Sequence, residues 1–319
     1  MTSTAADTVL AARLIELGAP LEIEEIQLPA PGEGEVRVDL HFGGVNPIDR
    51  YNAEGQVNPD TPRPRTLGGE AAGEVDGRLV LVAGEGLGFV RDGVWSQAAV
   101  VPRAAVYEVP AGVASEHAAA MGIAGLTALN CVRTLARVTA DDRVLVLGAS
   151  GGVGSMIVSL CRSAGATIWG QTGSEAKVAA ITAEGADRAI VGGPEDIHAA
   201  LADFAPTVVF DVLGDGYLSV AVEAMAPRGR IVSLGVSAGA DVAFNMRVLY
   251  RKMLTLLGYG GTILTPEERR PGLQAALEAV REGDLKVRID SVLPLRDVND
   301  AFRRLVNRQV QGKLLLDLH

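Results

Sequence analysis

Three glycines spaced three residues apart, Gly148, Gly151 and Gly154, are the residues of this sequence best suited to hold a phosphate group. They follow the apolar run 144–147, typical of a buried parallel strand, and precede apolar residues at helical spacing. In such a unit the first glycine permits a tight turn, Gly151 or Gly152 lets a pyrophosphate approach, and the third lets the helix pack closely. The helix N-terminus adds N–H groups. The pattern predicts a dinucleotide site formed by Ser150, Gly151, Gly152, Val153 and Gly154.

The expected second strand of this unit, 166–170, bears on the choice of dinucleotide. NAD-binding units usually end this strand with Asp or Glu, which binds the ribose 2′-hydroxyl. The segment that follows here contains Gln171, Thr172, Gly173 and Ser174, with Lys177 just beyond. A carboxylate would repel a 2′-phosphate, whereas hydroxyl and ammonium groups would bind it, although Glu175 lies among them and Lys177 could instead be a solvated helix residue. We predict a preference for NADP(H), with Thr172, Ser174 and Lys177 as contacts.

The composition limits the class of protein. A length of 319 residues favours two domains, and 48% hydrophobic residues suffice for full-sized cores. A formal net charge of −10 argues against nucleic acid and anionic membrane surfaces as partners. Both cysteines, Cys131 and Cys161, fall in expected helices, so we interpret them as buried small hydrophobic residues rather than a disulfide or metal pair.

Targeting and membrane signals are not expected. Residues 1–7 contain no basic region of the kind that begins a signal peptide. The uncharged run 144–161 is about as long as the shortest membrane span, but its glycines identify it as the nucleotide loop. We therefore expect a cytoplasmic protein with no membrane partner.

The rest of the chain positions these residues in an α/β architecture. The first third alternates between apolar and polar residues and predicts an all-β, barrel-like domain, which begins with an antiparallel strand pair over 8–26. One or two helices are expected over 118–137, and strands then alternate with helices, which favours a parallel, doubly wound sheet. Expected strands are 144–147, 167–169, 188–191, 207–210, 230–234 and 255–258. Expected helices are 153–164, 175–184, 194–202, 216–225 and 248–252. The tail should add a helix from Thr265 to about 282, short strands over 287–294, a helix over 298–307 and a final strand over 312–317.

Several short motifs make the chain resemble the medium-chain dehydrogenase/reductase superfamily, in its zinc-free, quinone oxidoreductase-like (zeta-crystallin type) branch. The motifs are Gly44-Val-Asn-Pro-Ile-Asp49, Leu67-Gly-Gly-Glu-Ala-Ala-Gly73, Gly93-Val-Trp-Ser-Gln97, Ala124-Gly-Leu-Thr-Ala128, the glycine loop and Gln311-Gly-Lys313. The resemblance implies a GroES-like β-barrel catalytic domain (1–117 with 263–319), an inserted Rossmann NADP(H)-binding domain (118–262), an active site in the cleft and a homodimer. The dimer could form by pairing of the apolar strand 253–258.

A catalytic zinc is not expected. Alcohol dehydrogenases of this superfamily bind it through Cys and His, and the matching positions here are Val45 or Asn46 and Gly69. The four-cysteine structural lobe is absent, and no Cys/His set has ligand spacing. Without a Lewis acid, oxidation of a simple alcohol is difficult, whereas hydride delivery to an already electrophilic alkene is easier.

Candidate catalytic residues follow from this chemistry. Charge develops on a carbonyl oxygen and needs hydrogen-bond donors and a proton source. Asn46 could donate to that oxygen or to the cofactor ribose, unless its side chain only closes an Asx turn. The resemblance places Tyr51 in the pocket, as a donor to the enolate or as a loop tyrosine that merely packs, and we expect Asp49 to orient its neighbours. It also implies that Thr127 touches the nicotinamide and Arg308 the 2′-phosphate, unless these are ordinary helix residues.

The expected activity is zinc-independent hydride transfer from NADPH to a quinone or an activated alkene. Gly214 and Gly235 follow later strands, where the adenosine and nicotinamide ends should lie. Relatives in this superfamily include enoyl-thioester reductases and lens crystallins, so an acyl-CoA or carrier-bound substrate and a low-turnover sensor or structural role stay open. A short-chain dehydrogenase would need Tyr-x-x-x-Lys, which none of the five tyrosines provides.

Overall fold

The computed structural model describes residues 8–319, and residues 1–7, on which the expectation of no signal peptide rested, lie outside the described part. The described residues form two compact units. Unit 1 comprises the described part of Met1–Leu126 together with Leu264–Arg281 and Ile289–His319, and unit 2 comprises Thr127–Ile263 and Glu282–Arg288. The chain therefore leaves unit 1 twice, once for most of unit 2 and once for the short segment Glu282–Arg288, and returns each time.

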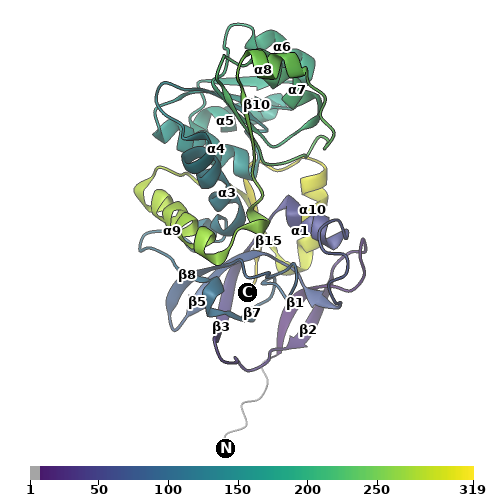
Figure 1. Ribbon diagram of the computed structural model, residues 1–319. Coiled ribbons are helices and arrows are strands. Elements are labelled where there is room, and N and C mark those ends of the chain that lie inside the picture. Colours follow the sequence, from purple (N-terminus) through teal and green to yellow (C-terminus); the bar gives the residue numbers. More distant parts are fainter. Residues whose placement is uncertain (1–7) are drawn as a thin grey trace, which may run out of the picture. The chain divides into compact units, whose positions relative to one another are not determined.

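Among the described residues, unit 2 is built on a six-stranded sheet in the order β11-β10-β9-β12-β13-β14. All neighbouring strands are parallel. The strands are β9 (Arg143–Leu147), β10 (Thr167–Thr172), β11 (Arg188–Val191), β12 (Val208–Asp211), β13 (Arg230–Ser233) and β14 (Thr255–Gly258). The helices are α3 (Leu126–Leu129), α4 (Gly152–Ser163), α5 (Val178–Glu184), α6 (Pro194–Leu201), α7 (Asp215–Ala224) and α8 (Met246–Arg251). Figure 1 shows these helices around the sheet, so the predicted doubly wound sheet is confirmed.

The core of unit 2 explains why these segments become strands. The central strands β9 and β12 are buried along 144–147 and 208–211, as expected for strands covered by helices on both faces. Continuous apolar runs are stable there because each side chain is removed from water. Cys131 and Cys161 are both buried and free, and burial raises the pKa of the Cys131 thiol to about 12, so both act as neutral apolar groups.

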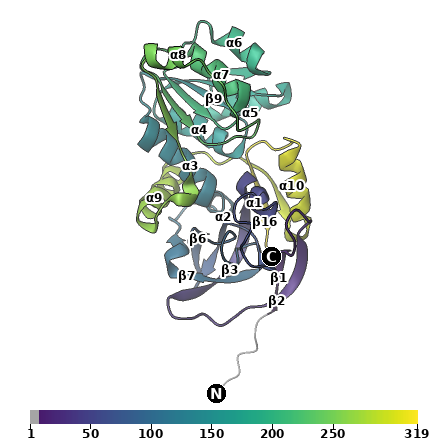
Figure 2. The same ribbon diagram turned by 45° about the vertical axis from the view of Figure 1, so that its right-hand side comes forward.

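Unit 1 contains, within its described residues, a mixed seven-stranded sheet and a three-stranded sheet. The first has the order β15-β16-β3-β5-β6-β8, with β7 also paired to β3, and the second has the order β2-β1-β4. The bounds are β1 (Thr8–Leu14), β2 (Glu22–Gln27), β3 (Glu35–Val45), β4 (Arg65–Thr66), β5 (Glu70–Val75), β6 (Arg78–Ala83), β7 (Ala98–Pro102), β8 (Val106–Glu108), β15 (Ile289–Pro294) and β16 (Lys313–Asp317). The last strand, β16, is parallel to β15 and antiparallel to β3, so the end of the chain completes a sheet begun near its start (Figure 2).

The helices of unit 1 depart from expectation in two places. They are α1 (Pro47–Ala53), α2 (Ser115–Ala118), α9 (Pro266–Glu282) and α10 (Val298–Val306). Helix α1 was not among the expected helices; it forms because Pro47 suits a first helical turn and the Asp49 carboxylate accepts a hydrogen bond from the Asn46 N–H at 2.9 Å. The helical stretch expected over 118–137 is confirmed, but wide π-type turns form its parts Met121–Gly125 and Asn130–Ala136.

The fold class predicted from the sequence, α/β with a Rossmann-type parallel sheet and a separate β-rich unit, is confirmed. The antiparallel pair expected over 8–26 is present as β1 and β2. Within residues 8–319, no helix combines the length and apolar character that crossing a membrane requires.

The third glycine of the loop generates a prediction about stability. A Cβ at Gly154 would lie 2.2 Å from the Gly148 carbonyl oxygen and 2.9 Å from the Ala149 Cα, both backbone atoms that cannot move cheaply. We therefore expect Gly154→Ala to lower the free energy of unfolding by about 1–3 kcal/mol, measured by urea denaturation. Gly173→Ala is the matched control, because a Cβ at Gly173 meets no atom within 4 Å. Equal stability of the two variants would show that helix α4 does not depend on this close approach.

Candidate active site

The strand order of unit 2 reverses beside β9, and the glycine loop begins there. Strands β10 and β11 lie on one side of β9, and β12, β13 and β14 lie on the other. In open parallel sheets, ligands bind at the carboxyl ends of strands next to such a reversal. Val212, just after β12, marks this edge: a Cβ at Gly148 would lie 2.4 Å from its side chain, and one at Gly235 would lie 3.0 Å from its carbonyl oxygen.

Gly214 belongs to the same edge. Its φ of 72° is in the left-handed region, and its N–H donates to the Asp211 carboxylate at 2.9 Å. The structure therefore brings together three segments that the sequence assigned separately to the cofactor, namely the glycine loop, Gly214 and Gly235.

The N-terminus of α4 has the features that a pyrophosphate needs. The N–H groups of 152–154 belong to the first turn, where no intrahelical acceptor exists. A Cβ at Gly151 would meet only the Gly148 carbonyl oxygen, at 3.5 Å, so the space before the helix is open. These unpaired donors and the positive end of the helix dipole fit a dinucleotide phosphate.

Gln171 is a residue of this site whose role the sequence did not reveal. Its buried side chain accepts a hydrogen bond from the Gly148 N–H at 3.0 Å and donates one to the Gly192 carbonyl at 2.9 Å. An amide provides both an acceptor and a donor, which a carboxylate cannot do. Gln171 therefore fixes the first glycine of the loop, and it is fully engaged within the protein.

Of the remaining predicted cofactor residues, one, Arg308, lies in unit 1, and the others lie in unit 2. Thr172 ends β10, and its hydroxyl lies 3.4 Å from the Ser150 hydroxyl, so these two side chains meet beside the loop. Ser174 precedes a single 3₁₀ turn that ends at Lys177. Thr127 lies on α3 in unit 2, whereas Arg308 follows α10 in unit 1 with a φ of 54°.

The catalytic candidate Asn46 lies in a buried polar network of unit 1. Its Nδ2 donates to Glu70 Oε1 at 2.7 Å, and its Oδ1 accepts from Lys313 Nζ at 2.7 Å. Lys313 Nζ also donates to Glu70 Oε1 at 2.8 Å. The exposed fractions of Asn46, Glu70 and Lys313 are only 3%, 0% and 2%. The Asn46 side chain therefore does more than close a turn before α1, because both ends of its amide bind the ion pair.

Asp49 interacts with the same network. Burial raises the pKa of its carboxyl to about 7, nearby Glu70 adds to the rise, and the Asn46 N–H and Lys313 oppose it. A carboxyl in this position is partly protonated near neutral pH.

Tyr51 lies two residues further along α1 and is half-buried. The Arg50 guanidinium carbon lies 4.8 Å from the centre of its ring, close enough for a cation–π contact. Asn46 thus caps α1, and Asp49 and Tyr51 lie within the same short helix.

Gly69, which the resemblance matches to a zinc ligand, carries no side chain and has two apolar side chains close beside it. A Cβ there would lie 2.8 Å from the Phe89 ring and 3.1 Å from an Ile123 methyl group. The Phe89 carbonyl is held in turn by the Arg65 guanidinium at 2.7 Å and the Thr61 hydroxyl at 3.0 Å. Within residues 8–319, no group of three or more His, Cys, Asp or Glu side chains is arranged to hold a metal ion.

Glu70 and Lys313 were quoted in motifs but were assigned no role from the sequence. The available signal was their position: each begins a buried strand of small or apolar residues, Ala71-Ala72 and 314–316 respectively. A charged residue of either sign at the start of such strands indicates a buried ion pair, because an isolated buried charge is too costly.

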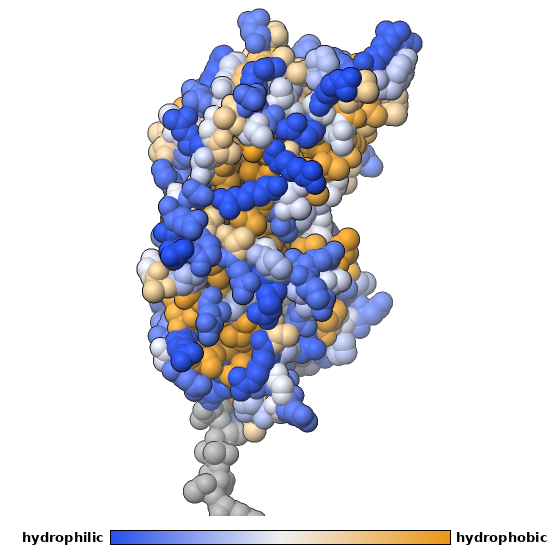
Figure 3. Space-filling model, turned by 60° about the vertical axis from the view of Figure 1, so that its left-hand side comes forward, coloured by the Kyte–Doolittle hydropathy of each residue, from blue (hydrophilic) through white to orange (hydrophobic). Residues whose placement is uncertain are grey.

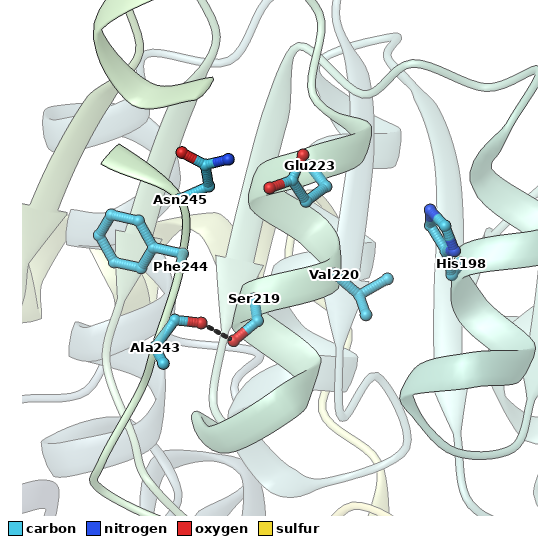
Figure 4. A pocket seen from close by; sticks show the side chains of 7 residues that line it. All are labelled: His198, Ser219, Val220, Glu223, Ala243, Phe244 and Asn245. Atoms are coloured by element: carbon cyan, nitrogen blue, oxygen red, sulfur yellow. Dashed lines mark hydrogen bonds between the residues drawn. The ribbon is translucent and has the colours of Figure 1, made fainter. Parts of the chain in front are cut away.

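A separate surface pocket of about 410 Å³ lies along α7 in unit 2 (Figure 4). It is lined by His198, Ser219, Val220, Glu223, Ala243, Phe244 and Asn245. The Ser219 hydroxyl donates to the Ala243 carbonyl at 2.5 Å and ties the helix to the segment before α8. None of the predicted site residues lines this pocket.

Comparison with known families and proteins identifies the relatives of this chain. The family described as zinc-binding dehydrogenase matches residues 152–278, which begin at α4 and include neither Asn46 nor Gly69. The chain is 29% identical to quinone oxidoreductase 1 of Escherichia coli K12 over 321 aligned residues, which cover 94% of this chain and 96% of the relative.

Solved structures give the same result. The crystal structure of AibC is 30% identical, with a TM-score of 0.87 and coverage of 97% of this chain and 96% of that one. The quinone oxidoreductase of Thermus thermophilus, determined alone and in complex with NADPH, is 28% identical, with a TM-score of 0.83 and coverage of 97% and 100%.

The raised pKa of Asp49 generates a prediction about pH and stability. In the unfolded chain this carboxyl ionises near its ordinary value of 3.8, and in the folded protein it ionises at about 7. The folded state therefore binds the extra proton in this window, so Asp49 costs stability progressively as pH rises from 4 to 7. We expect Asp49→Asn to gain stability relative to wild type between pH 5 and pH 8, on the order of 2 kcal/mol.

Urea denaturation at several pH values measures this gain. Asp60→Asn, which changes an exposed loop carboxylate of the same unit, is the control and should show no such trend. A stability difference between Asp49→Asn and wild type that stays constant from pH 5 to pH 8 would show that Asp49 does not titrate in this range.

Proposed function

Because the chain belongs to the medium-chain dehydrogenase/reductase superfamily and is quinone oxidoreductase-like, we propose that it catalyses zinc-independent hydride transfer from NADPH to a quinone or an activated alkene. The relatives support an oxidoreductase that uses a nicotinamide cofactor. We propose the zinc independence, the preference for NADPH and the class of acceptor from the residues of this chain.

The observation that carries the proposal is the glycine at position 69 with apolar groups beside it. A zinc ligand at this position would need a side chain, which glycine lacks, and the groups beside it are the Phe89 ring and an Ile123 methyl group, 2.8 and 3.1 Å from where a Cβ would be. Stabilisation of developing negative charge then falls to neutral hydrogen-bond donors. Such donors suit acceptors that are electrophilic without a metal, such as quinones and α,β-unsaturated carbonyl compounds.

The preference for NADPH is supported by the residues after β10. The last two residues of β10 are Gln171 and Thr172, so no carboxylate ends this strand. The Gln171 side chain is hydrogen-bonded to the backbone of Gly148 and Gly192. The hydroxyl of Ser174 and the ammonium of Lys177 follow within the next turn, and both are groups that bind a phosphate. Arg308 is proposed as a further contact of the 2′-phosphate.

The mechanism assigns one role to each candidate. NADPH, when bound, supplies the hydride. Asn46 has a second hydrogen on Nδ2 beyond the one given to Glu70, and this N–H and the Tyr51 hydroxyl donate to the acceptor oxygen as charge develops on it. The proton that completes the reduction comes from Tyr51 or from water. Asp49 holds the backbone of Asn46, and Thr127 contacts the nicotinamide.

The direct test is cofactor oxidation followed by the absorbance of the reduced nicotinamide. NADPH and NADH are each offered with a quinone, a 2-alkenal and an enoyl-CoA. We expect turnover with NADPH at a kcat/KM at least about 10-fold above that with NADH, since one lost charged contact costs about 1.4 kcal/mol or more. The best acceptor decides between quinone or enone reduction and the enoyl-thioester alternative. Tight NADPH binding without turnover on any acceptor would support the sensor or structural alternative instead.

We also infer that the protein forms a homodimer through β14. This strand ends the sheet of unit 2, so one of its edges has no strand partner among the described residues. Large hydrophobic side chains are exposed on and around it: Met246, Tyr250, Met253, Leu256 and Ile263. Figure 3 shows one face of the molecule, on which hydrophobic residues gather in several areas between hydrophilic ones. An exposed apolar edge strand is stable when a second copy covers it.

Light scattering at micromolar concentration measures the assembly. We expect a mass twice the 33.2 kDa of the chain, and we expect Leu256→Glu to shift the population to monomer, because it would bury a charge at the interface. Leu10→Glu, at an exposed leucine of β1, is the control and should leave the dimer intact. A wild-type monomer under these conditions would contradict the inference.

A further inference from the structure

The Glu70 side chain lies in a slot formed by two glycines. A Cβ at Gly44 would lie 2.3 Å from Glu70 Oε1 and 2.5 Å from the Ala119 carbonyl oxygen. A Cβ at Gly122 would lie 2.8 Å from the Glu70 Cβ and 3.0 Å from Oε2. Neither glycine has a φ in the left-handed region. Their role is therefore to leave room for this carboxylate and not to permit a turn.

The groups around the carboxylate are all donors. Oε1 accepts from Asn46 Nδ2 at 2.7 Å and Lys313 Nζ at 2.8 Å, and Oε2 accepts from the Ile123 N–H at 2.7 Å. A carboxylate accepts at both oxygens, whereas the amide of glutamine would turn a donor toward one of these groups. The slot is therefore selective for glutamate by charge as well as by shape.

Lys313 donates a hydrogen bond to the oxygen of the Asn46 amide. Its ammonium has three hydrogens and makes three contacts: Glu70 Oε1 at 2.8 Å, Asn46 Oδ1 at 2.7 Å and the Val45 carbonyl at 3.3 Å. A rotation of Asn46 about its last bond would point Oδ1 at the carboxylate and Nδ2 at the ammonium. The pair therefore permits one orientation of the amide.

We propose that Glu70 and Lys313 are positioning residues whose role in turnover is to fix the Asn46 amide so that its second N–H faces the acceptor. This inference rests on the proposed function, because that function assigns the N–H to the acceptor oxygen. Neither Glu70 nor Lys313 touches the reacting atoms, and both act through Asn46. A donor held in advance does not have to reorganise when charge develops.

A double-mutant cycle in kcat tests this dependence. We expect Lys313→Met to lower kcat about 100-fold, the cost of a small displacement of a catalytic group. In an Asn46→Ala background the same substitution should change kcat less than about 3-fold, because the amide that Lys313 orients is already gone. Glu70→Gln should behave in the same way. Additive losses, with Lys313→Met as harmful without Asn46 as with it, would overturn the proposal.

Matched controls separate positioning from general damage. Lys286→Met removes an exposed lysine of the same length and should leave kcat unchanged. The dissociation constant for NADPH, measured by calorimetry, should be the same in every variant, because the glycine loop belongs to unit 2. A wild-type protein without turnover would count against the proposed function, and the measurement below would still test the positioning.

The orientation of Asn46 can be measured in the wild-type protein, so the proposal does not depend on whether the variants fold. Selective ¹⁵N-asparagine labelling gives side-chain NH₂ resonances, and Asn46→Ala, which leaves the Lys313–Glu70 pair in place, identifies those of Asn46. We expect two separate proton resonances that exchange with solvent at least about 100-fold more slowly than those of the exposed Asn307, because the amide is buried and held at both ends. Rapid exchange of the Asn46 amide would overturn the proposal.

Discussion

The buried ion pair between Lys313 and Glu70 is the constraint on which unit 1 depends. Removing two charges from water costs several kcal/mol per ion, and the cost is offset only when the pair is close and every remaining hydrogen-bonding position is used. Here the carboxylate accepts three hydrogen bonds and the ammonium donates three. Because Glu70 begins β5 and Lys313 begins β16, the end of the chain must be in place before this charge is satisfied. The last strand of the described chain therefore supplies the counter-ion of a buried charge on β5.

In unit 2, the position of the glycine loop depends on close contacts at residues that have no side chain. The Gly148 carbonyl stands 2.2 Å from where a Gly154 Cβ would be, and Gly148 itself packs on Val212. These contacts bring the N-terminus of α4 to the carboxyl edge of the sheet, where phosphates bind. Gln171 then holds the loop from the next strand with one donor and one acceptor. A neutral amide meets this requirement without placing a negative charge near a bound phosphate.

The sequence predicted unit 2 well because parallel strands buried on both faces are long apolar runs with glycine turns between them. The expected strands 188–191 and 255–258 coincide with β11 and β14. Helix α1 was missed because its seven residues are too few for an apolar periodicity, and its cap depends on Asp49 and Asn46. The π-type turns around Gly122 depend on the position of Glu70, which sequence spacing does not encode. The Asn46 network joins residues more than 200 positions apart, so no local pattern could reveal it.

The same network limits the chemistry that the proposed function can use. An amide held at both ends offers the acceptor one neutral N–H, which stabilises a partial negative charge far less than a metal ion would. The weakness of this donor is acceptable only when the acceptor itself delocalises the incoming electrons, as quinones and conjugated carbonyl compounds do. The groups beside Gly69, where the resemblance would place a metal ligand, are the apolar side chains of Phe89 and Ile123. The glycine in place of a metal ligand and the fixed orientation of Asn46 are therefore linked. An amide N–H stabilises charge less than a metal ion would, so it has to be better positioned.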